Sequence, residues 1–271
     1  MQISKAKDEY IPQAKQLWNS HFDNGTPGFC YFAFSLLKKD DIYIAVEDDK
    51  VIAMIMAITE LEYKKQKGFY LYSACTHPDY EDSDVMQKLT EFALKDQDER
   101  GKSFCAVAPG SEEKFTFWQS MGFDKVVSMR KCEVEIKRNI WNSAEFDIIT
   151  ASRFRPAREK YGVENIVHYT QDSYGKYTRY MYTCGGSTAE MQNAYCVYFI
   201  ENGQLVVKEL LAQSTLHATQ ILQAVRERTG FEQATVYLSE DSTLFLGEGH
   251  KEKMYAVRGI SDDVYINLMF E

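Results

Sequence analysis

The chain has 271 residues, of which 45% are hydrophobic and 26% are charged, and its formal net charge is -9. No segment approaches the roughly 18 consecutive apolar residues of a membrane-spanning helix, so we expect no membrane partner. The negative charge disfavours nucleic acid, because sequence-independent binding to it relies on a positive surface. The first residues carry charges at short intervals and lack the apolar core of a secretory signal, which predicts a soluble, cytoplasmic protein.

The cysteines and histidines are not spaced for a metal site. The six cysteines form no Cys-x-x-Cys pair, which argues against both a zinc knuckle and a disulfide framework. The five histidines are scattered along the chain. We therefore expect reduced thiols and no metal.

The first half begins with helices and continues with strands. Asp8 is a candidate N-cap for a helix whose apolar face contains Ala14, Leu17 and Trp18. Ser111 is a candidate cap for a later helix that Gly122 ends. In chain order, the patterns predict a helix from residue 8, a helix at 29–38, strands at 42–46, 51–58 and 69–76, a helix from 85 to about 100, a strand at 103–107, a helix from 111 and closing strands at 123–136.

The second half repeats this order. Asn202-Gly203 is a strong hairpin signal, and Ser214 or Thr215 is expected to cap a helix that Gly230 ends. Strands are predicted at 178–184, 194–200, 205–212, 234–238, 254–257 and 264–270. The tyrosines from 161 to 198 could form a stacking surface for a ligand, but half-buried strands favour tyrosine in general, and we prefer that interpretation. The repetition predicts domains at 1–138 and 139–271.

One junction of strand, loop and helix is a candidate phosphate site. The strand at 69–76 leads through a short loop into the helix that begins near Val85. Such a junction points several unpaired backbone N–H groups at one place, and the helix dipole adds attraction for an anion.

The residues of this junction resemble the GNAT superfamily of acetyl-CoA-dependent N-acetyltransferases. The resemblance rests on Tyr-Leu-Tyr-Ser-Ala-Cys-Thr-His-Pro-Asp-Tyr at 70–80, the helix behind it and Phe-Trp-Gln-Ser-Met-Gly-Phe at 117–123, and it spans roughly residues 3–135. It implies an α/β (α+β) fold of two GNAT-like domains, each a mixed, largely antiparallel twisted sheet flanked by helices. It also implies acetyl-CoA as cofactor and a small-molecule or peptide amine as acceptor.

The same resemblance implies which residues bind the cofactor. In the family, the strand that corresponds to 69–76 separates from its neighbour and bonds the pantetheine arm, and the next loop holds the pyrophosphate. That loop usually has Arg or Gln, two variable residues, Gly, one variable residue, and Gly or Ala; Glu81, Asp84 and Met86 stand at the three fixed places. The cofactor-binding residues implied are Cys75, Thr76, Glu81, Asp82, Ser83, Asp84, Val85 and Met86.

The acidic residues of this loop favour a weakened or lost pyrophosphate site. Glu81, Asp82 and Asp84 would repel phosphate, whereas a carboxylate or a hydroxyl at 82–84 suits the N-terminus of a helix. We prefer the second interpretation, in which side chains cap the helix where the phosphate would lie. The second half has only Gln213, Ser214 and Thr215 at its corresponding junction, which predicts that it binds no pyrophosphate.

The position that the family's general acid usually occupies holds no acidic side chain here. Many family members have a tyrosine four residues before the Gly-Phe that ends the corresponding helix, and Trp118 stands there. An indole N–H donates a hydrogen bond but is no acid at neutral pH, so a core or pocket-wall role is favoured. Tyr72 and Tyr80 are the remaining hydroxyl candidates.

Candidates for a general base or a nucleophile are equally undistinguished. Glu60, Glu62 and His77 are near strand ends, where a solvated carboxylate or a structural histidine is the commoner role. Cys75 lacks a recognisable catalytic partner and is better interpreted as a small buried residue.

Two functions remain in competition. The first is an N-acetyltransferase with weakened cofactor binding, and the second is a non-catalytic relative that uses the fold as a binding or interaction module. Nothing in the pattern identifies the acceptor amine or an oligomeric state.

Overall fold

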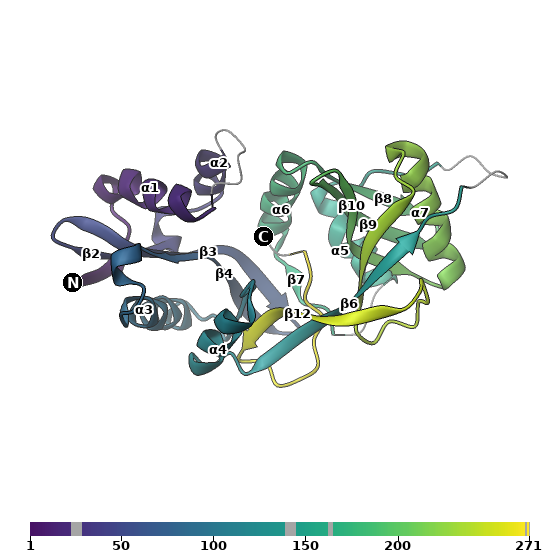
Figure 1. The fold of residues 1–271 in the computed structure, drawn as a ribbon. Helices are drawn as coiled ribbons and strands as arrows, with labels where there is room; N and C mark the ends of the chain where they lie inside the picture. The colour runs from purple at the N-terminus through teal and green to yellow at the C-terminus, as the bar shows by residue number, and fades with distance from the viewer. Residues whose placement is uncertain (23–28, 139–144, 162–164, 269, 271) are drawn as a thin grey trace. The chain divides into compact units, whose positions relative to one another are not determined.

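The computed structural model describes residues 1–22, 29–138, 145–161, 165–268 and 270 (Figure 1). The chain forms two compact units, which we describe separately. Unit 1 consists of Met1–Lys125 and Ala256–Ile260, and unit 2 consists of Val126–Tyr255 and Ser261–Glu271.

Unit 1 is a mostly antiparallel sheet with helices on both faces. The strand order is β1-β2-β3-β4-β5 followed by the end of β12, and only the β4–β5 pair is parallel. Helices α1 and α2 lie on one face and α3 and α4 on the other (Figure 1). The elements are β1 (Gln2–Lys5), η1 (Asp8–Tyr10), α1 (Ile11–Phe22), α2 (Phe29–Ser35), η2 (Lys39–Asp41), β2 (Ile42–Glu47), β3 (Lys50–Tyr63), β4 (Gln66–Thr76), η3 (Pro78–Tyr80), α3 (Val85–Glu99), β5 (Phe104–Val107) and α4 (Glu112–Ser120).

The central strand of unit 1 explains why its sequence is continuously apolar. Every residue from Val51 to Ile58 of β3 is buried. A strand whose two faces are both covered by helices needs apolar side chains at each position rather than at every second one.

Unit 2 has the same kind of sheet, in the order β12-β6-β11-β10-β9-β8, with a parallel β10–β11 pair. Cys196 of β9 belongs to the core beneath α7, whereas its neighbour Tyr195 contacts Phe154 of α5, so the two helices cover opposite faces. The elements are β6 (Lys125–Glu135), α5 (Ala151–Tyr161), β7 (His168–Tyr169), α6 (Gln171–Thr183), β8 (Gly186–Met191), β9 (Ala194–Glu201), β10 (Gln204–Ala212), α7 (Thr215–Thr229), β11 (Gln233–Ser239) and β12 (Gly249–Arg258).

The predicted fold class is confirmed, and the predicted repeat of element order is visible. The series β2-β3-β4-α3-β5 in unit 1 corresponds to β8-β9-β10-α7-β11 in unit 2. The compact units divide between Lys125 and Val126. The predicted domain boundary adjoins residues 139–144, which lie outside the described residues, and it stays a prediction.

The closing strands are exchanged relative to our expectation. Strand β6, which was expected to close the first half, pairs with β11 in unit 2. The last residues of β12, Ala256–Arg258, pair with β5 in unit 1. A local pattern predicts a strand but does not select its partner, since consecutive strands are neighbours in only about two-thirds of cases.

Two strand predictions in the second half were wrong. The segment predicted as a strand at 178–184 belongs mostly to helix α6, whose buried face contains Tyr174, Tyr177 and Met181 at helical spacing. These tyrosines fill the core, so the structural interpretation of the tyrosine-rich stretch holds for a helix rather than a strand. In the segment predicted as a strand at 264–270, the described residues form only an isolated bridge, between Tyr265 and Ile166.

Most predicted ends of helices and hairpins are confirmed. Ser111 accepts from the N–H of Lys114, and Ser214 accepts from the N–H of His217, each at 3.4 Å. Gly230 has φ 81° and ends α7. Two ends differ: Asp8 begins a 3-10 turn, so α1 starts three residues later, and the helix predicted at 29–38 ends at Ser35.

Gly259→Ala is expected to destabilise the protein by about 1 to 3 kcal/mol more than Gly101→Ala. Both glycines have positive φ, at 85° and 79°, so both substitutions introduce similar backbone strain. Only at Gly259 would the new Cβ clash, lying 2.3 Å from the carbonyl oxygen of Ser103, the residue before β5. Urea denaturation of both variants measures the difference, and equal losses would contradict the close approach of the chain after β12 to β5.

Candidate functional site

The parallel pair in unit 1 opens before β4 ends. Strand β4 pairs with β5 from Gly68 to Leu71, where Leu71 is opposite Val107, the last residue of β5. Strand β4 continues to Thr76. We call residues 72–76 of β4, which extend past the last residue paired with β5, the β4 notch.

A β-bulge shapes this notch. Met56 of β3 is opposite Tyr72, but Met54 is opposite Cys75, so β4 has one residue more than β3 in this interval. Ser73 lies in the bulge with φ 53°, an uncommon value for a residue other than glycine. Its buried hydroxyl accepts a hydrogen bond of 2.8 Å from the indole N–H of Trp18 in α1. Helix α1 therefore holds the bulge in place, a contact that no local sequence signal predicted.

The two implied strand residues lie at this notch. Cys75 and Thr76 follow the bulge and pair with Met54 and Ala53 of β3. The Cys75 side chain is buried, and desolvation raises the pKa of its thiol to about 12. The thiolate is thus scarce at neutral pH, which agrees with a packing role for the side chain.

The loop between β4 and α3 is acidic and exposed. Glu81, Asp82, Ser83 and Asp84 are exposed, Met86 is half-buried, and Val85 is buried as the first residue of α3. The Ser83 hydroxyl donates to the carbonyl of Tyr80 at 2.5 Å and accepts from the N–H of Val85 at 3.4 Å. The cap is therefore a long hydrogen bond from the backbone N–H of Val85 to a hydroxyl.

The carboxylates of the loop do not cap the helix. Asp84 takes the N-cap position without a side-chain cap, and its carboxylate lies 2.7 Å from Lys88 Nζ. Glu81 Oε1 lies 4.0 Å from His21 Nε2. Among residues 82–84, Ser83 is the one whose side chain accepts from a backbone N–H at the start of α3. The Asp84 carboxylate instead forms an ion pair with Lys88.

Comparison with known proteins places this half of the chain in a family. The family described as acetyltransferase (GNAT) domain matches residues 2–126, which include the β4 notch and the loop behind it. Residues 2–126 therefore match a GNAT acetyltransferase domain, and we call this part of the chain the GNAT domain. A search of curated proteins found no match.

Solved structures share the fold over nearly the whole chain. A GCN5-related N-acetyltransferase from Kribbella flavida has a TM-score of 0.70 at 12% identity, with 94% of this chain and 70% of that chain covered. One from Anabaena variabilis ATCC 29413 has a TM-score of 0.70 at 12% identity, covering 95% and 72%. Eis1 from Mycobacterium abscessus has a TM-score of 0.68 at 10% identity, covering 96% and 74%. At these identities the likeness concerns the fold alone.

The tryptophan in the usual tyrosine place belongs to the core of the GNAT domain. Trp118 is 4% exposed and makes edge-to-face contacts with Phe117 and Phe123, at centroid distances of 5.2 and 5.1 Å. Of the alternative hydroxyls, Tyr72 adjoins the bulge. The Tyr80 hydroxyl bonds the carboxylate of Glu47, which raises the pKa of Tyr80 and disfavours proton release.

The candidate bases lie away from the β4 notch or have structural partners. Glu60 and Glu62 pair with Phe69 and Lys67, at the other end of β4. At about 3.3 Å per residue, Phe69 is roughly 20 Å from Cys75 along the strand. His77 follows the notch, but its Nδ1 accepts from the N–H of Asp79 at 3.3 Å and so caps η3.

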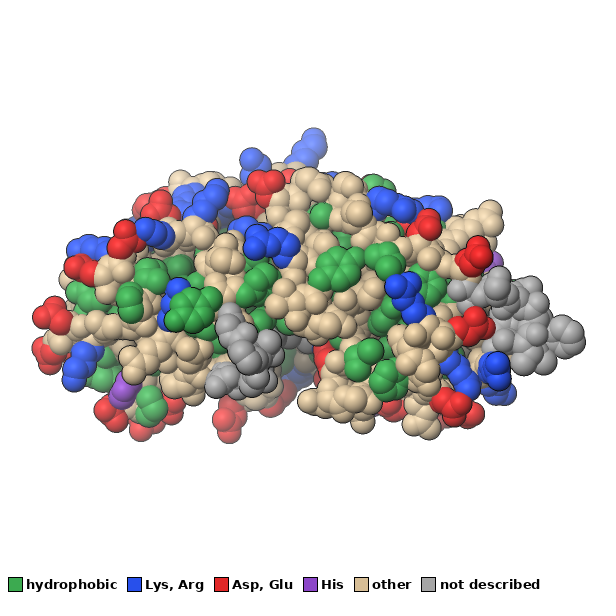
Figure 2. Space-filling view, turned by 90° about the horizontal axis from the view of Figure 1, so that it is seen from above, with side chains coloured by type: hydrophobic (Ala, Val, Ile, Leu, Met, Phe, Trp, Pro, Cys, Tyr) green, Lys and Arg blue, Asp and Glu red, His purple; other side chains and the backbone are tan. Residues whose placement is uncertain are grey.

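Three further expectations concerned a metal site, a membrane-spanning helix and a basic surface for nucleic acid. Within them, no group of three or more His, Cys, Asp and Glu side chains is arranged for a metal ion. None of their helices is long and apolar enough to cross a membrane. Acidic and basic side chains are intermixed on the face shown in Figure 2, which does not display the continuous basic surface that nucleic acid favours.

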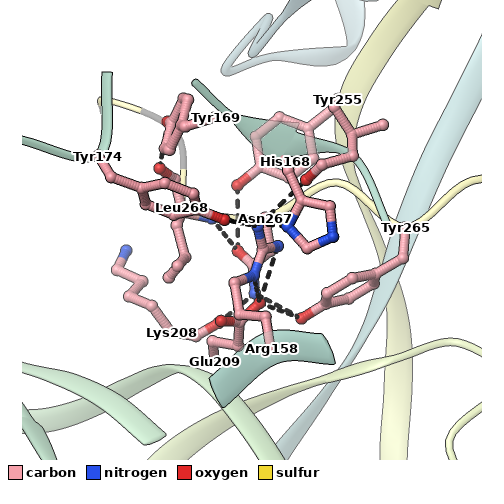
Figure 3. Close-up of polar contacts among 11 residues, drawn as sticks. Arg158, His168, Tyr169, Tyr174, Lys208, Glu209, Tyr255, Tyr265, Asn267 and Leu268 are labelled. Atoms are coloured by element: carbon pink, nitrogen blue, oxygen red, sulfur yellow. Dashed lines mark hydrogen bonds and ion pairs between the residues drawn. The ribbon is translucent and has the colours of Figure 1, made fainter. Parts of the chain in front are cut away.

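A buried polar cluster in unit 2 was not predicted. Arg158 of α5 and Glu209 of β10 are both fully buried, and their nearest atoms, Nη2 and Oε1, are 3.1 Å apart (Figure 3). Arg158 Nη1 also donates to the carbonyl of Val167 and to the hydroxyl of Tyr174, each at 3.1 Å. The two charged residues are 51 positions apart, so no local pattern connects them.

His168, at the rim of this cluster, is expected to make stability fall on acidification. Burial and the nearby cations Arg158 and Arg155 lower its pKa from 6.5 to about 3. Above pH 6.5 the imidazole is neutral in both folded and unfolded states. Below it, only the unfolded state gains a proton, which costs about 2 kcal/mol of stability between pH 7 and pH 5.

Denaturation of the wild type and His168→Gln at pH 7 and pH 5 tests this dependence. The variant should lose less stability over the interval, because it has no imidazole to protonate. Glu159 Oε1 lies 3.9 Å from His168 Nε2 and would favour the charged form if it moved closer. Equal losses in both proteins would show that His168 is not responsible.

Proposed function

We propose that the GNAT domain is an N-acetyltransferase that takes acetyl-CoA at the β4 notch and transfers the acetyl group to an amine. The supporting observation is the β4 notch itself. The bulge at Ser73, which Trp18 hydrogen-bonds, changes the direction of the β4 backbone just after the pairing of β4 with β5 ends. A pantetheine arm carries amide groups, which the backbone of a strand can hydrogen-bond in the manner of a further strand.

The residues of this site suit the pantetheine arm of the cofactor better than its pyrophosphate. The strand edge suits the pantetheine arm, and the first turn of α3 supplies the positive end of a helix dipole. Against this, Glu81, Asp82 and Asp84 lie exposed in the loop that would face the pyrophosphate. We therefore expect the domain to hold the pantetheine part better than the phosphates.

The residues of the domain supply positioning rather than acid catalysis. Acetyl-CoA, when bound, would supply a thioester whose acetyl carbon the amine attacks; the C–S bond breaks, and CoA leaves as a thiol while the amine gives up a proton. The buried Trp118 and the neutral thiol of Cys75 offer no proton at neutral pH. Alignment of amine and thioester by the strand edge must then provide most of the acceleration. Burial of the pantetheine arm beside the apolar residues of β4 would exclude water from the thioester.

A second candidate function is a non-catalytic binding module. It is favoured by the two departures from the usual site, the acidic loop and Trp118. In this case the fold and the β4 notch persist, and the chain binds a ligand or partner without acetyl transfer.

Calorimetric titration with acetyl-CoA and with acetyl-pantetheine separates the two candidates. We expect weak binding of both ligands, with affinities within tenfold of each other, because the loop gains little from the phosphates. Hydrogen exchange should then slow in peptides that cover residues 72–76. No heat from either ligand at millimolar concentration would rule out the acetyltransferase. Binding without turnover of polyamines, aminoglycosides or lysine peptides would favour the module.

A further inference from the structure

Strand β10 of unit 2 repeats the irregularity of β4. Val207 is opposite Tyr198 of β9 and Glu209 is opposite Val197, so Lys208 is an extra residue in a β-bulge. The parallel pairing of β10 with β11 ends at Val207, although β10 continues to Ala212. We call residues 208–212, which extend past the last residue paired with β11, the β10 notch.

A segment of the same chain bonds the bulge at this notch. Asn267 Nδ2 donates to the carbonyl of Lys208 at 2.5 Å (Figure 3). The Asn267 carboxamide oxygen accepts from the N–H of Leu268 at 2.8 Å and from the Tyr255 hydroxyl at 3.3 Å. Both sides of the carboxamide are thus engaged. Asn267 is 4% exposed, so these bonds lie out of water.

Tyr265 of the same segment hydrogen-bonds Glu209, the residue that follows Lys208 in β10. Its hydroxyl donates to Glu209 Oε1 at 3.0 Å and accepts from Asn267 Nδ2 at 3.0 Å. Its ring packs in a cluster with Val206 of β10 and Tyr237 of β11. The segment therefore lies against the two strands at the place where they separate.

The buried ion pair of Arg158 and Glu209 connects β10 to the segment by a second route. Glu209 Oε1 is shared by Tyr265 and by Arg158, whose Nε is 3.2 Å away. Arg158 also holds the carbonyl of Val167, and the N–H of Val167 donates to the carbonyl of Tyr265 at 2.9 Å. The contacts thus run from β10 through α5 to the segment and back to β10.

We propose that residues 264–268 are a built-in occupant of the β10 notch, which closes unit 2 to an extended ligand. The carboxamide of Asn267 makes the bond to the bulge that an amide of an external ligand would otherwise make. Unit 2 then keeps the bulged strand of the repeat but uses it for an intramolecular contact. Its shared polar contacts tie the segment and β10 together, so the two should open together.

Hydrogen exchange of the full chain tests this coupling. Asn267→Ala removes the bond to Lys208, and it should speed exchange tenfold or more in peptides covering both 208–212 and 264–268. Gln204→Ala, an exposed change on the same strand, is the control and should leave both peptides unchanged. Faster exchange in 264–268 alone would overturn the proposal.

Two further measurements keep the test decisive. Tyr265→Phe loses only a hydroxyl, so it should fold even if Asn267→Ala does not, and it should speed exchange in both peptides by a smaller factor. Millimolar pantetheine should leave exchange of 208–212 unchanged in the wild type, and slower exchange there would show that the β10 notch is open to ligands. These readouts come from unit 2, so absence of ligand binding at the β4 notch leaves them unaffected.

Discussion

Glu209→Gln is expected to lower the free energy of unfolding by about 3 to 5 kcal/mol. The substitution keeps the size of the side chain and removes its charge. Arg158 has no exposed surface, so its guanidinium would remain charged and buried without a counter-ion. The penalty of that unpaired charge far exceeds the loss of a single neutral hydrogen bond.

Chemical denaturation of Glu209→Gln and two companion proteins measures this cost. The double variant Arg158→Met with Glu209→Gln removes both charges and should recover most of the loss. Glu190→Gln breaks an ion pair with Arg153, which is half exposed, and should cost less than about 1 kcal/mol. A loss for Glu209→Gln no larger than for Glu190→Gln would contradict the importance of the buried pair.

The features predicted correctly from the sequence have local causes. Ser111 and Ser214 cap helices through hydrogen bonds that span three residues. Asn202 and Gly203 have positive φ, as their hairpin turn requires. Because each signal lies within one turn of chain, it could be recognised without knowledge of the fold.

The features missed depend on partners far apart in the sequence. The bulge at Ser73 is fixed by Trp18, 55 residues earlier. The exchange of β6 and β12 could not be predicted because the pattern of a strand specifies which face is buried but not which strand lies beside it. Tyr180 and Tyr182 suggested strand alternation, whereas the buried positions Tyr174 and Tyr177 follow the helical period of α6.

For the candidate site, the sequence located the strand and loop but not their geometry. Cys75 and Thr76 do lie at the opening of the parallel pair, and their assignment to the cofactor stays a prediction. The helix cap was expected from residues 82–84, and the choice of Ser83 over the two aspartates depends on side-chain geometry. The order of residues along the chain does not determine which of these side chains caps the helix.

The double variant Glu81→Arg with Asp84→Gly is expected to bind acetyl-CoA ten- to a hundredfold more tightly than the wild type. Both carboxylates are exposed and neither caps α3, so their removal leaves the Ser83 cap intact. Loss of Asp84 also releases Lys88, now 2.7 Å from the carboxylate, to face an incoming phosphate. The change therefore removes two negative charges and makes two positive ones available.

A matched control separates local from overall charge in this experiment. Glu99→Arg with Asp98→Asn makes the same change in net charge at the other end of α3 and should alter affinity little, because solvent screens exposed charges beyond about 10 Å at 0.1 M salt. The gain from the loop variant should shrink as salt is raised, while acetyl-pantetheine, which lacks the phosphates, should bind both variants equally. An unchanged acetyl-CoA affinity in the loop variant would mean that the acidic loop is not the obstacle, and would shift the cause of weak binding to the β4 notch.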